Sequence, residues 1–129
     1  MKDIENRFDI EKLIRHFYDR ILADDLIGFI FTDIAKIDLE EHLPILFDFW
    51  EMTLFNQPVY KRNPMRVHIE LHRKQQLKSE FFDRWLSLFN QSVDDLFKGQ
   101  VANLAKTRAL SIAFVMQNKL AGLGSRPLI

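Results

Sequence analysis

The residues of this chain best suited to bind a metal are its four histidines, His16, His42, His68 and His72. His68 and His72 stand four positions apart, so a helix would place both imidazoles on one face, a spacing that can hold one metal ion. A zinc or di-iron site also needs further ligands, and the nearby Glu70 would point away from both histidines. His16 lies on the outer part of a predicted helix, where we expect it to be solvated.

A haem group needs only one axial side chain from the protein, because the porphyrin supplies the other nitrogen ligands of the iron. His68 offers such an imidazole beside the apolar residues Met65 and Leu71. The hydrogen-bond donors suited to the other side of a haem are Tyr18, His42 and Trp85. All three also fit the edge of an ordinary helical core. Spacing alone leaves three hypotheses: a haem protein, a non-haem metal-binding bundle and a helical partner-binding bundle.

Hydrophobic residues recur at helical spacing through nearly the whole chain, which predicts an all-α fold of about five helices and no sheet. The first helix presents an apolar face made of Ile10, Leu13, Ile14, Phe17 and Ile21. Gly28 breaks this pattern, and residues 29–31 follow as a short apolar turn. Tyr18 is at the border of the apolar face of this first helix.

A second helix is predicted to begin at Asp38, with Glu41 as its capping-box partner. It carries His42, and Pro44 leaves its start uncertain by several residues. After a loop over residues 55–63, Asn63 and Pro64 open a short third helix with His68 and His72 on one side.

Two longer helices complete the predicted fold. The fourth opens at Ser79 and Glu80 and carries Trp85. The fifth runs from about Lys98 to Ala121, and Gly122 is placed to close it as a C′ glycine.

Composition narrows the classes of function. The length of 129 residues suits one domain, residues 1–129. Lys+Arg and Asp+Glu both number 18, which offers no general attraction for nucleic acid or a membrane surface. The absence of cysteine excludes disulfides, zinc-thiolate sites and iron–sulfur clusters. The charged N-terminus has no signal-peptide core, and no apolar stretch is long enough to cross a bilayer, so we expect a cytoplasmic protein.

Several segments, in this order and spacing, add a family resemblance. They are Phe17-Tyr18-Asp19-Arg20, Gly28-Phe29-Ile30-Phe31, Glu41-His42 with Phe49-Trp50, Pro64-Met65-Arg66-Val67-His68-Ile69-Glu70-Leu71 and Phe81-Phe82-Asp83-Arg84-Trp85-Leu86-Ser87-Leu88-Phe89. Over nearly its whole length the chain resembles a group III truncated haemoglobin. That resemblance implies a two-over-two helical sandwich around haem b, iron protoporphyrin IX.

The resemblance also implies roles for five residues. His68 becomes the proximal iron ligand, because it alone, unlike His72, keeps the family's spacing to Pro64 and to the Trp85 segment. Phe31 packs on the haem plane, and Trp85 also contacts the haem. The distal residues near a bound gas are Tyr18, His42 and Trp85.

The expected ligand is oxygen or another diatomic gas, with an unidentified reductase as partner. We expect a monomer, because no heptad seam and no large exposed apolar stripe is apparent. The sequence does not decide between plain gas binding and a haem-dependent redox activity of the nitric oxide dioxygenase or peroxidase type.

Overall fold

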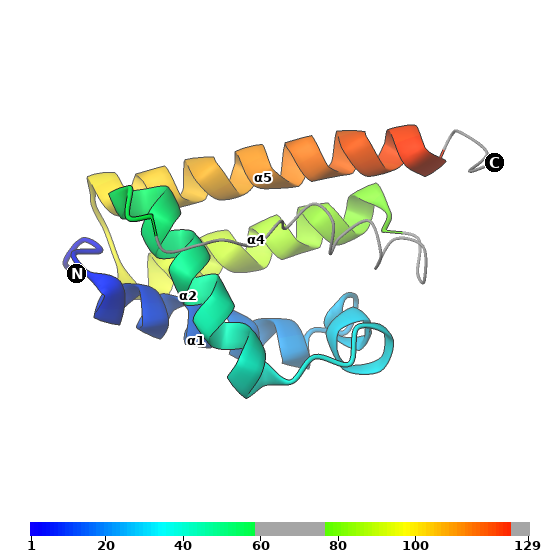
Figure 1. Ribbon diagram of the computed structural model, residues 1–129, viewed down its shortest axis with the longest axis horizontal. Coiled ribbons are helices and arrows are strands. Elements are labelled where there is room, and N and C mark those ends of the chain that lie inside the picture. Colours follow the sequence, from blue (N-terminus) through cyan, green and yellow to red (C-terminus); the bar gives the residue numbers. More distant parts are fainter. Residues whose placement is uncertain (59–76, 125–129) are drawn as a thin grey trace.

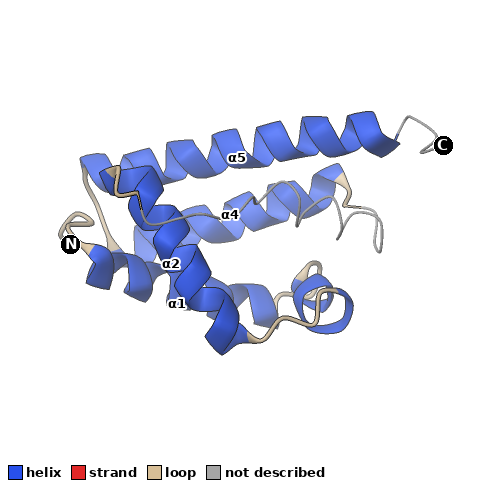
Figure 2. Ribbon diagram, in the orientation of Figure 1, coloured by secondary structure: helices blue, strands red, loops and turns tan. Residues whose placement is uncertain are grey.

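The computed structural model describes residues 1–58 and 77–124, and the side chains of these residues as far as position 118. The described elements are α1 (Arg7–Ala23), the π-helix η1 (Ile30–Ile34), α2 (Leu39–Phe55), α4 (Ser79–Leu96) and α5 (Gln100–Gly124) (Figure 1). Within these ranges there are helices and loops and no strand, which confirms the all-α prediction (Figure 2). The predicted short third helix with His68 and His72 lies outside the described residues.

Helix α1 forms where the apolar periodicity predicts it. The side chain of Asn6 caps its start by accepting a hydrogen bond from the backbone N–H of Asp9 at 3.0 Å. Its predicted apolar residues are all buried in the core: Ile10, Leu13, Ile14, Phe17 and Ile21. Tyr18, predicted at the border of this face, is buried as well.

Helix α2 begins at Leu39, before Pro44, so the proline lies inside the helix. Asp38 is the N-cap, as predicted, but its carboxylate accepts from the backbone N–H of Glu40 at 3.1 Å rather than from Glu41, the predicted capping-box partner. The helix ends at Phe55, and its C-cap Asn56 adopts a left-handed conformation with φ of 57°. This start places His42 in the first turns of α2.

The segment between α1 and α2 is more regular than the predicted apolar turn. Gly28 packs so closely against the end of α1 that an added Cβ would lie 3.1 Å from the carbonyl oxygens of Ile21 and Leu22. The chain then winds into η1, in which the N–H of Ala35 binds the carbonyl of Ile30 at 2.7 Å. Phe31 projects from this π-helix.

The start of α5 is capped by a residue from the other end of the sequence. The carboxylate of Asp3 accepts hydrogen bonds from the backbone N–H groups of Val101 at 2.9 Å and Ala102 at 2.8 Å. Gly99, just before the helix, has φ of 149°, and a Cβ there would overlap the Asp3 carboxyl group. The first residues and the last helix are therefore joined directly.

Helix α5 runs to Gly124, so the prediction that Gly122 closes it was wrong. The intrahelical hydrogen bonds continue past a glycine, which costs helix propensity but does not end a helix by itself. Helix α4 begins at Ser79, as predicted.

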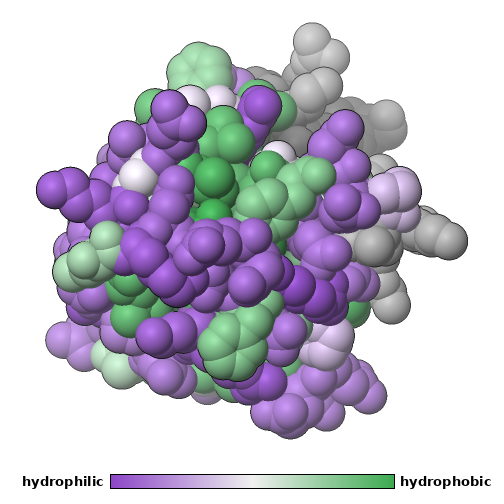
Figure 3. Space-filling model, turned by 90° about the vertical axis from the view of Figure 1, so that its left-hand side faces the viewer, coloured by the Kyte–Doolittle hydropathy of each residue, from purple (hydrophilic) through white to green (hydrophobic). Residues whose placement is uncertain are grey.

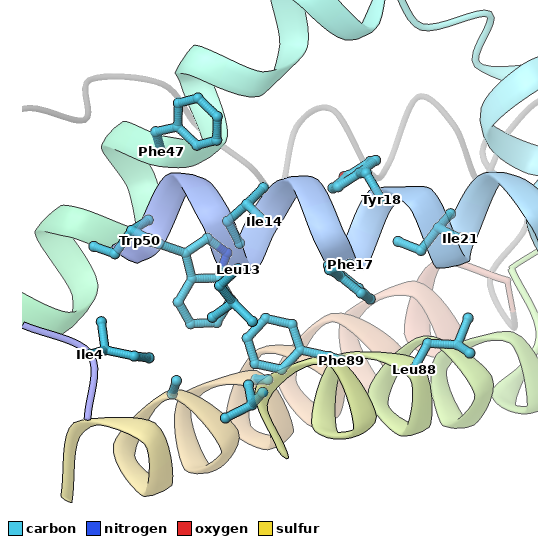
Figure 4. Close-up of a cluster of buried hydrophobic side chains, with 14 of the residues drawn as sticks. Ile4, Leu13, Ile14, Phe17, Tyr18, Ile21, Phe47, Trp50, Leu88 and Phe89 are labelled. Atoms are coloured by element: carbon cyan, nitrogen blue, oxygen red, sulfur yellow. The ribbon is translucent and has the colours of Figure 1, made fainter. Parts of the chain in front are cut away.

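The helices form two packed pairs, α1 with α2 and α4 with α5, and the pairs contact each other through α1 with α4 and α2 with α5. This is the two-over-two arrangement. Alanines at positions 102, 105, 109 and 113 are buried on α5, where small side chains allow close packing. In Figure 4, Phe17 of α1 points toward Phe89 of α4, while Tyr18 lies on another side of α1. On the face shown in Figure 3, hydrophilic side chains cover most of the surface, with smaller hydrophobic areas among them.

Candidate functional site

Two of the predicted distal residues form a hydrogen-bonded pair. The phenol oxygen of Tyr18 on α1 lies 3.2 Å from Nε2 of His42 on α2, and their ring centroids are 5.6 Å apart in an edge-on arrangement. Only 5% of Tyr18 is exposed. Burial raises the pKa of this phenol well above its ordinary value of 10, so the hydroxyl keeps its proton at any physiological pH. The site therefore holds a protonated hydroxyl beside an imidazole.

Phe31 closes one side of this pair. Its ring meets Tyr18 edge to face, with centroids 5.8 Å apart and planes at 88°. The winding of η1 delivers Phe31 to this place, and the side chain is half-buried. The structure thus brings together three of the predicted site residues, Tyr18, His42 and Phe31.

Trp85 is joined to this group through Phe17. Its indole meets Phe17 edge to face at 5.6 Å and stacks on Phe89 at 5.8 Å with planes at 14°. Phe17 in turn contacts Tyr18, with centroids 5.6 Å apart. Trp85 therefore lies one aromatic ring away from the Tyr18–His42 pair.

Several large apolar side chains from three elements are only partly buried while packing on the core. They are Phe29, Phe31, Phe81, Trp85, Leu86 and Ile112. A flat, mostly apolar cofactor is held by apolar side chains together with a few polar groups that face its reactive centre. Apolar side chains and the Tyr18–His42 donor pair therefore fit the distal side of a haem.

The predicted proximal residue, His68, and its alternative, His72, lie outside the described residues. Among residues 1–58 and 77–118 no group of three or more His, Asp or Glu side chains is arranged to hold a metal ion. His16, predicted to be solvated, is half-buried, with its Nε2 2.9 Å from the carboxylate of Asp95 on α4.

Comparison with known proteins identifies the family. No protein-family model matches the chain. A group 3 truncated haemoglobin of Campylobacter jejuni is 33% identical over 122 residues, which cover 92% of this chain and 94% of the relative. The crystal structure of a group III truncated haemoglobin from Campylobacter jejuni matches with a TM-score of 0.81 and 31% identity, over 93% of this chain and 95% of the other. The chain belongs to the group III truncated haemoglobins.

For this truncated haemoglobin, family membership confirms the globin fold and implies a haem site. The roles of individual residues stay predictions. None of the helices described here has the length and hydropathy that crossing a bilayer requires.

The sequence did not predict the ion pair between Asp24, at the end of α1, and Arg84 of α4. This ion pair lies next to the predicted site residue Trp85 in the chain. No periodicity joins Asp24 and Arg84, because they are 60 positions apart in the sequence and meet only in the fold.

Proposed function

We propose that this truncated haemoglobin binds haem b through His68, with Phe31 and Trp85 in contact with the haem, and that it binds oxygen or another diatomic ligand beside Tyr18, His42 and Trp85. The observation that carries the proposal is the hydrogen-bond distance of 3.2 Å between the buried Tyr18 hydroxyl and His42 Nε2. A buried donor pair flanked by apolar rings suits a small polar ligand.

The haem, when bound, supplies an iron with one position open to a diatomic ligand. The chain's own residues then decide how long the ligand stays. A diatomic ligand in such a site would accept hydrogen bonds, and the Tyr18 hydroxyl and the Trp85 indole could each donate one to it. Each bond contributes on the order of 1–3 kcal/mol in a dry site, or roughly tenfold or more in residence time.

His42 controls the direction in which Tyr18 donates. An imidazole with its proton on Nδ1 accepts the phenol hydrogen at Nε2, whereas one with its proton on Nε2 donates to the phenol oxygen and frees the hydroxyl for the ligand. The Tyr18–His42 pair can therefore form its hydrogen bond with either tautomer of the neutral imidazole, without gaining or losing a charge.

Slow oxygen release favours redox chemistry on oxygen, nitric oxide or peroxide over bulk oxygen delivery. Such chemistry requires a reductase to restore ferrous iron. We include it in the proposal as the activity that two or more distal donors favour.

The first experiment is an absorption spectrum of the protein expressed with haem available. We expect a Soret band that His68→Ala weakens or abolishes and that the matched variant His72→Ala leaves in place. Bound zinc or iron without porphyrin, lost in both variants, would instead support the non-haem metal-binding bundle. A colourless protein whose stability neither variant changes would support the partner-binding bundle.

A further inference from the structure

An ion pair joins the end of α1 to the early part of α4. Oδ1 of Asp24 lies 3.5 Å from Nε of Arg84, and only 10% of the Asp24 side chain is exposed. The second carboxylate oxygen, Oδ2, accepts hydrogen bonds from the backbone N–H groups of Leu26 at 3.0 Å and Ile27 at 3.1 Å. The backbone therefore holds this carboxylate in place where the guanidinium meets it.

Both partners stand next to residues of the proposed site. Arg84 directly precedes Trp85 on α4, and Asp24 lies between Tyr18 and Phe31 in the chain. An apolar contact accompanies the ion pair: the rings of Phe29 and Phe81 meet edge to face at 6.2 Å. Together the two contacts join α4 to the segment that leads to Phe31.

Aromatic packing by itself does not fix the position of Trp85 along α1. Its contact with Phe17 of α1 is a ring contact, and the hydrophobic attraction that supports it is non-directional. The ion pair adds an attraction between Arg84, of which 45% is exposed, and a carboxylate that the backbone holds in place, so it favours one position of Arg84 relative to the end of α1. The geometry points to Asp24 and Arg84 as a positioning pair that holds Trp85 in register with Tyr18 and Phe31 at the gas-binding site; this inference rests on the proposed function.

A second set of polar contacts between the same helices serves as a comparison. Asp95 of α4 pairs with His16 and Arg20 of α1. It lies on the far side of Phe89 from Trp85 along α4, and 43% of its side chain is exposed. On α4, Asp95 stands ten positions from Trp85, whereas Arg84 is the direct neighbour of Trp85 in the chain.

The experiment compares Arg84→Gln, Asp24→Asn and the double variant with Asp95→Asn as the matched control. The asparagine side chain of the Asp24→Asn variant keeps an acceptor for the backbone N–H groups, so the change removes mainly the ion pair. Each protein is loaded with haem and carbon monoxide. The measurements are the infrared carbon monoxide stretch, the NMR cross-peak of the Trp85 indole N–H and the oxygen dissociation rate.

We expect each single variant to shift the stretch and the indole cross-peak and to speed oxygen dissociation about fivefold, the equivalent of one weakened hydrogen bond. The double variant should do no more than either single one, because both act through one contact. Arg84→Lys, which keeps the charge, should restore part of the wild-type stretch. The control should match the wild type.

Each alternative result has a definite meaning. A wild type without a Soret band overturns the proposed function and the positioning role together. A normal Soret band with unchanged stretch and cross-peak in Arg84→Gln overturns the positioning role alone, as do additive effects in the double variant or equal effects from Asp95→Asn.

Discussion

The Tyr18 hydroxyl and His42 Nε2, 3.2 Å apart, come from helices that belong to the same packed pair. Their contact crosses between α1 and α2 at the place where both helices lie against the aromatic core. Because burial keeps the phenol neutral, this contact is a hydrogen bond between uncharged groups whenever His42 is neutral. Under the proposed function, a bound ligand competes with His42 for the hydrogen of the Tyr18 hydroxyl.

Replacing Tyr18 with Phe removes this hydroxyl while keeping the ring and its packing. We expect oxygen to dissociate roughly tenfold faster, because one donor to the ligand is lost. Stopped-flow measurement of oxygen release from the ferrous protein checks this. Trp50→Phe is a suitable control, since Trp50 stacks on Phe89 at 4.9 Å within the core. An unchanged rate in Tyr18→Phe would remove Tyr18 from the distal role.

Asp3→Ala removes the acceptor for two N–H groups at the start of α5. We expect a loss of about 1–2 kcal/mol in the free energy of unfolding, measured by urea denaturation. Asp94→Ala is the matched control, because Asp94 is 62% exposed and pairs with Lys106 at 2.7 Å. The Asp94→Ala variant should lose no more than about 0.5 kcal/mol in the free energy of unfolding. Equal losses in the two variants would contradict the cap.

Acid should destabilise the protein through Asp3 and Asp9. Burial alone would raise the pKa of the Asp9 carboxyl, but its contacts with Lys2 and with the N–H of Glu5 outweigh that effect and hold it below 3.8. The backbone N–H groups of Val101 and Ala102 likewise outweigh burial and lower the pKa of Asp3. A lowered folded-state pKa gives stability that is complete above the ordinary value and is lost as pH falls through the folded value.

We therefore expect the free energy of unfolding to fall as the pH drops below about 4. In Asp9→Asn the decline should be shallower, because one of the two groups no longer titrates. Urea denaturation at a series of pH values, with the haem content held equal, measures both slopes. Parallel curves for the wild type and the variant would rule out Asp9 as a source of acid sensitivity.

Gly28→Ala tests the close approach of the turn to α1. The added methyl group would meet two backbone carbonyls at 3.1 Å, and backbone cannot move aside as a side chain can. We expect a destabilisation of about 1–3 kcal/mol, read from thermal or urea unfolding. Ala23→Gly, at the exposed end of α1, gives the reverse change at a nearby site. Wild-type stability in Gly28→Ala would show that the turn has room to shift.

Local pattern predicted those parts of the fold that depend on neighbours in sequence. The apolar face from Ile10 to Ile21, the Asp38 cap and the start of α4 at Ser79 all follow from spacing and capping chemistry within a few residues. The prediction that Gly122 closes α5 was wrong, because a glycine after an apolar helix is typical of a C′ position but does not always end the helix. Here the helix continues to Gly124.

No local pattern in the sequence predicted the polar contacts between residues that are far apart in the chain. Asp3 reaches Val101, and Asp24 reaches Arg84, only because the helices fold back on one another. Tyr18 and His42 were selected as site residues from their types and the family resemblance, and the fold then placed them within hydrogen-bond distance. For His68 the sequence and the family remain the sources of the prediction.

The contact of Asp3 with the start of α5 has a consequence for the order of events during synthesis. Asp3 leaves the ribosome 98 residues before its partner Val101 and 99 residues before Ala102. Until those two residues emerge, the Asp3 carboxylate has no backbone N–H groups of α5 to bind. This contact can therefore form only after α1, α2 and α4 have been synthesised.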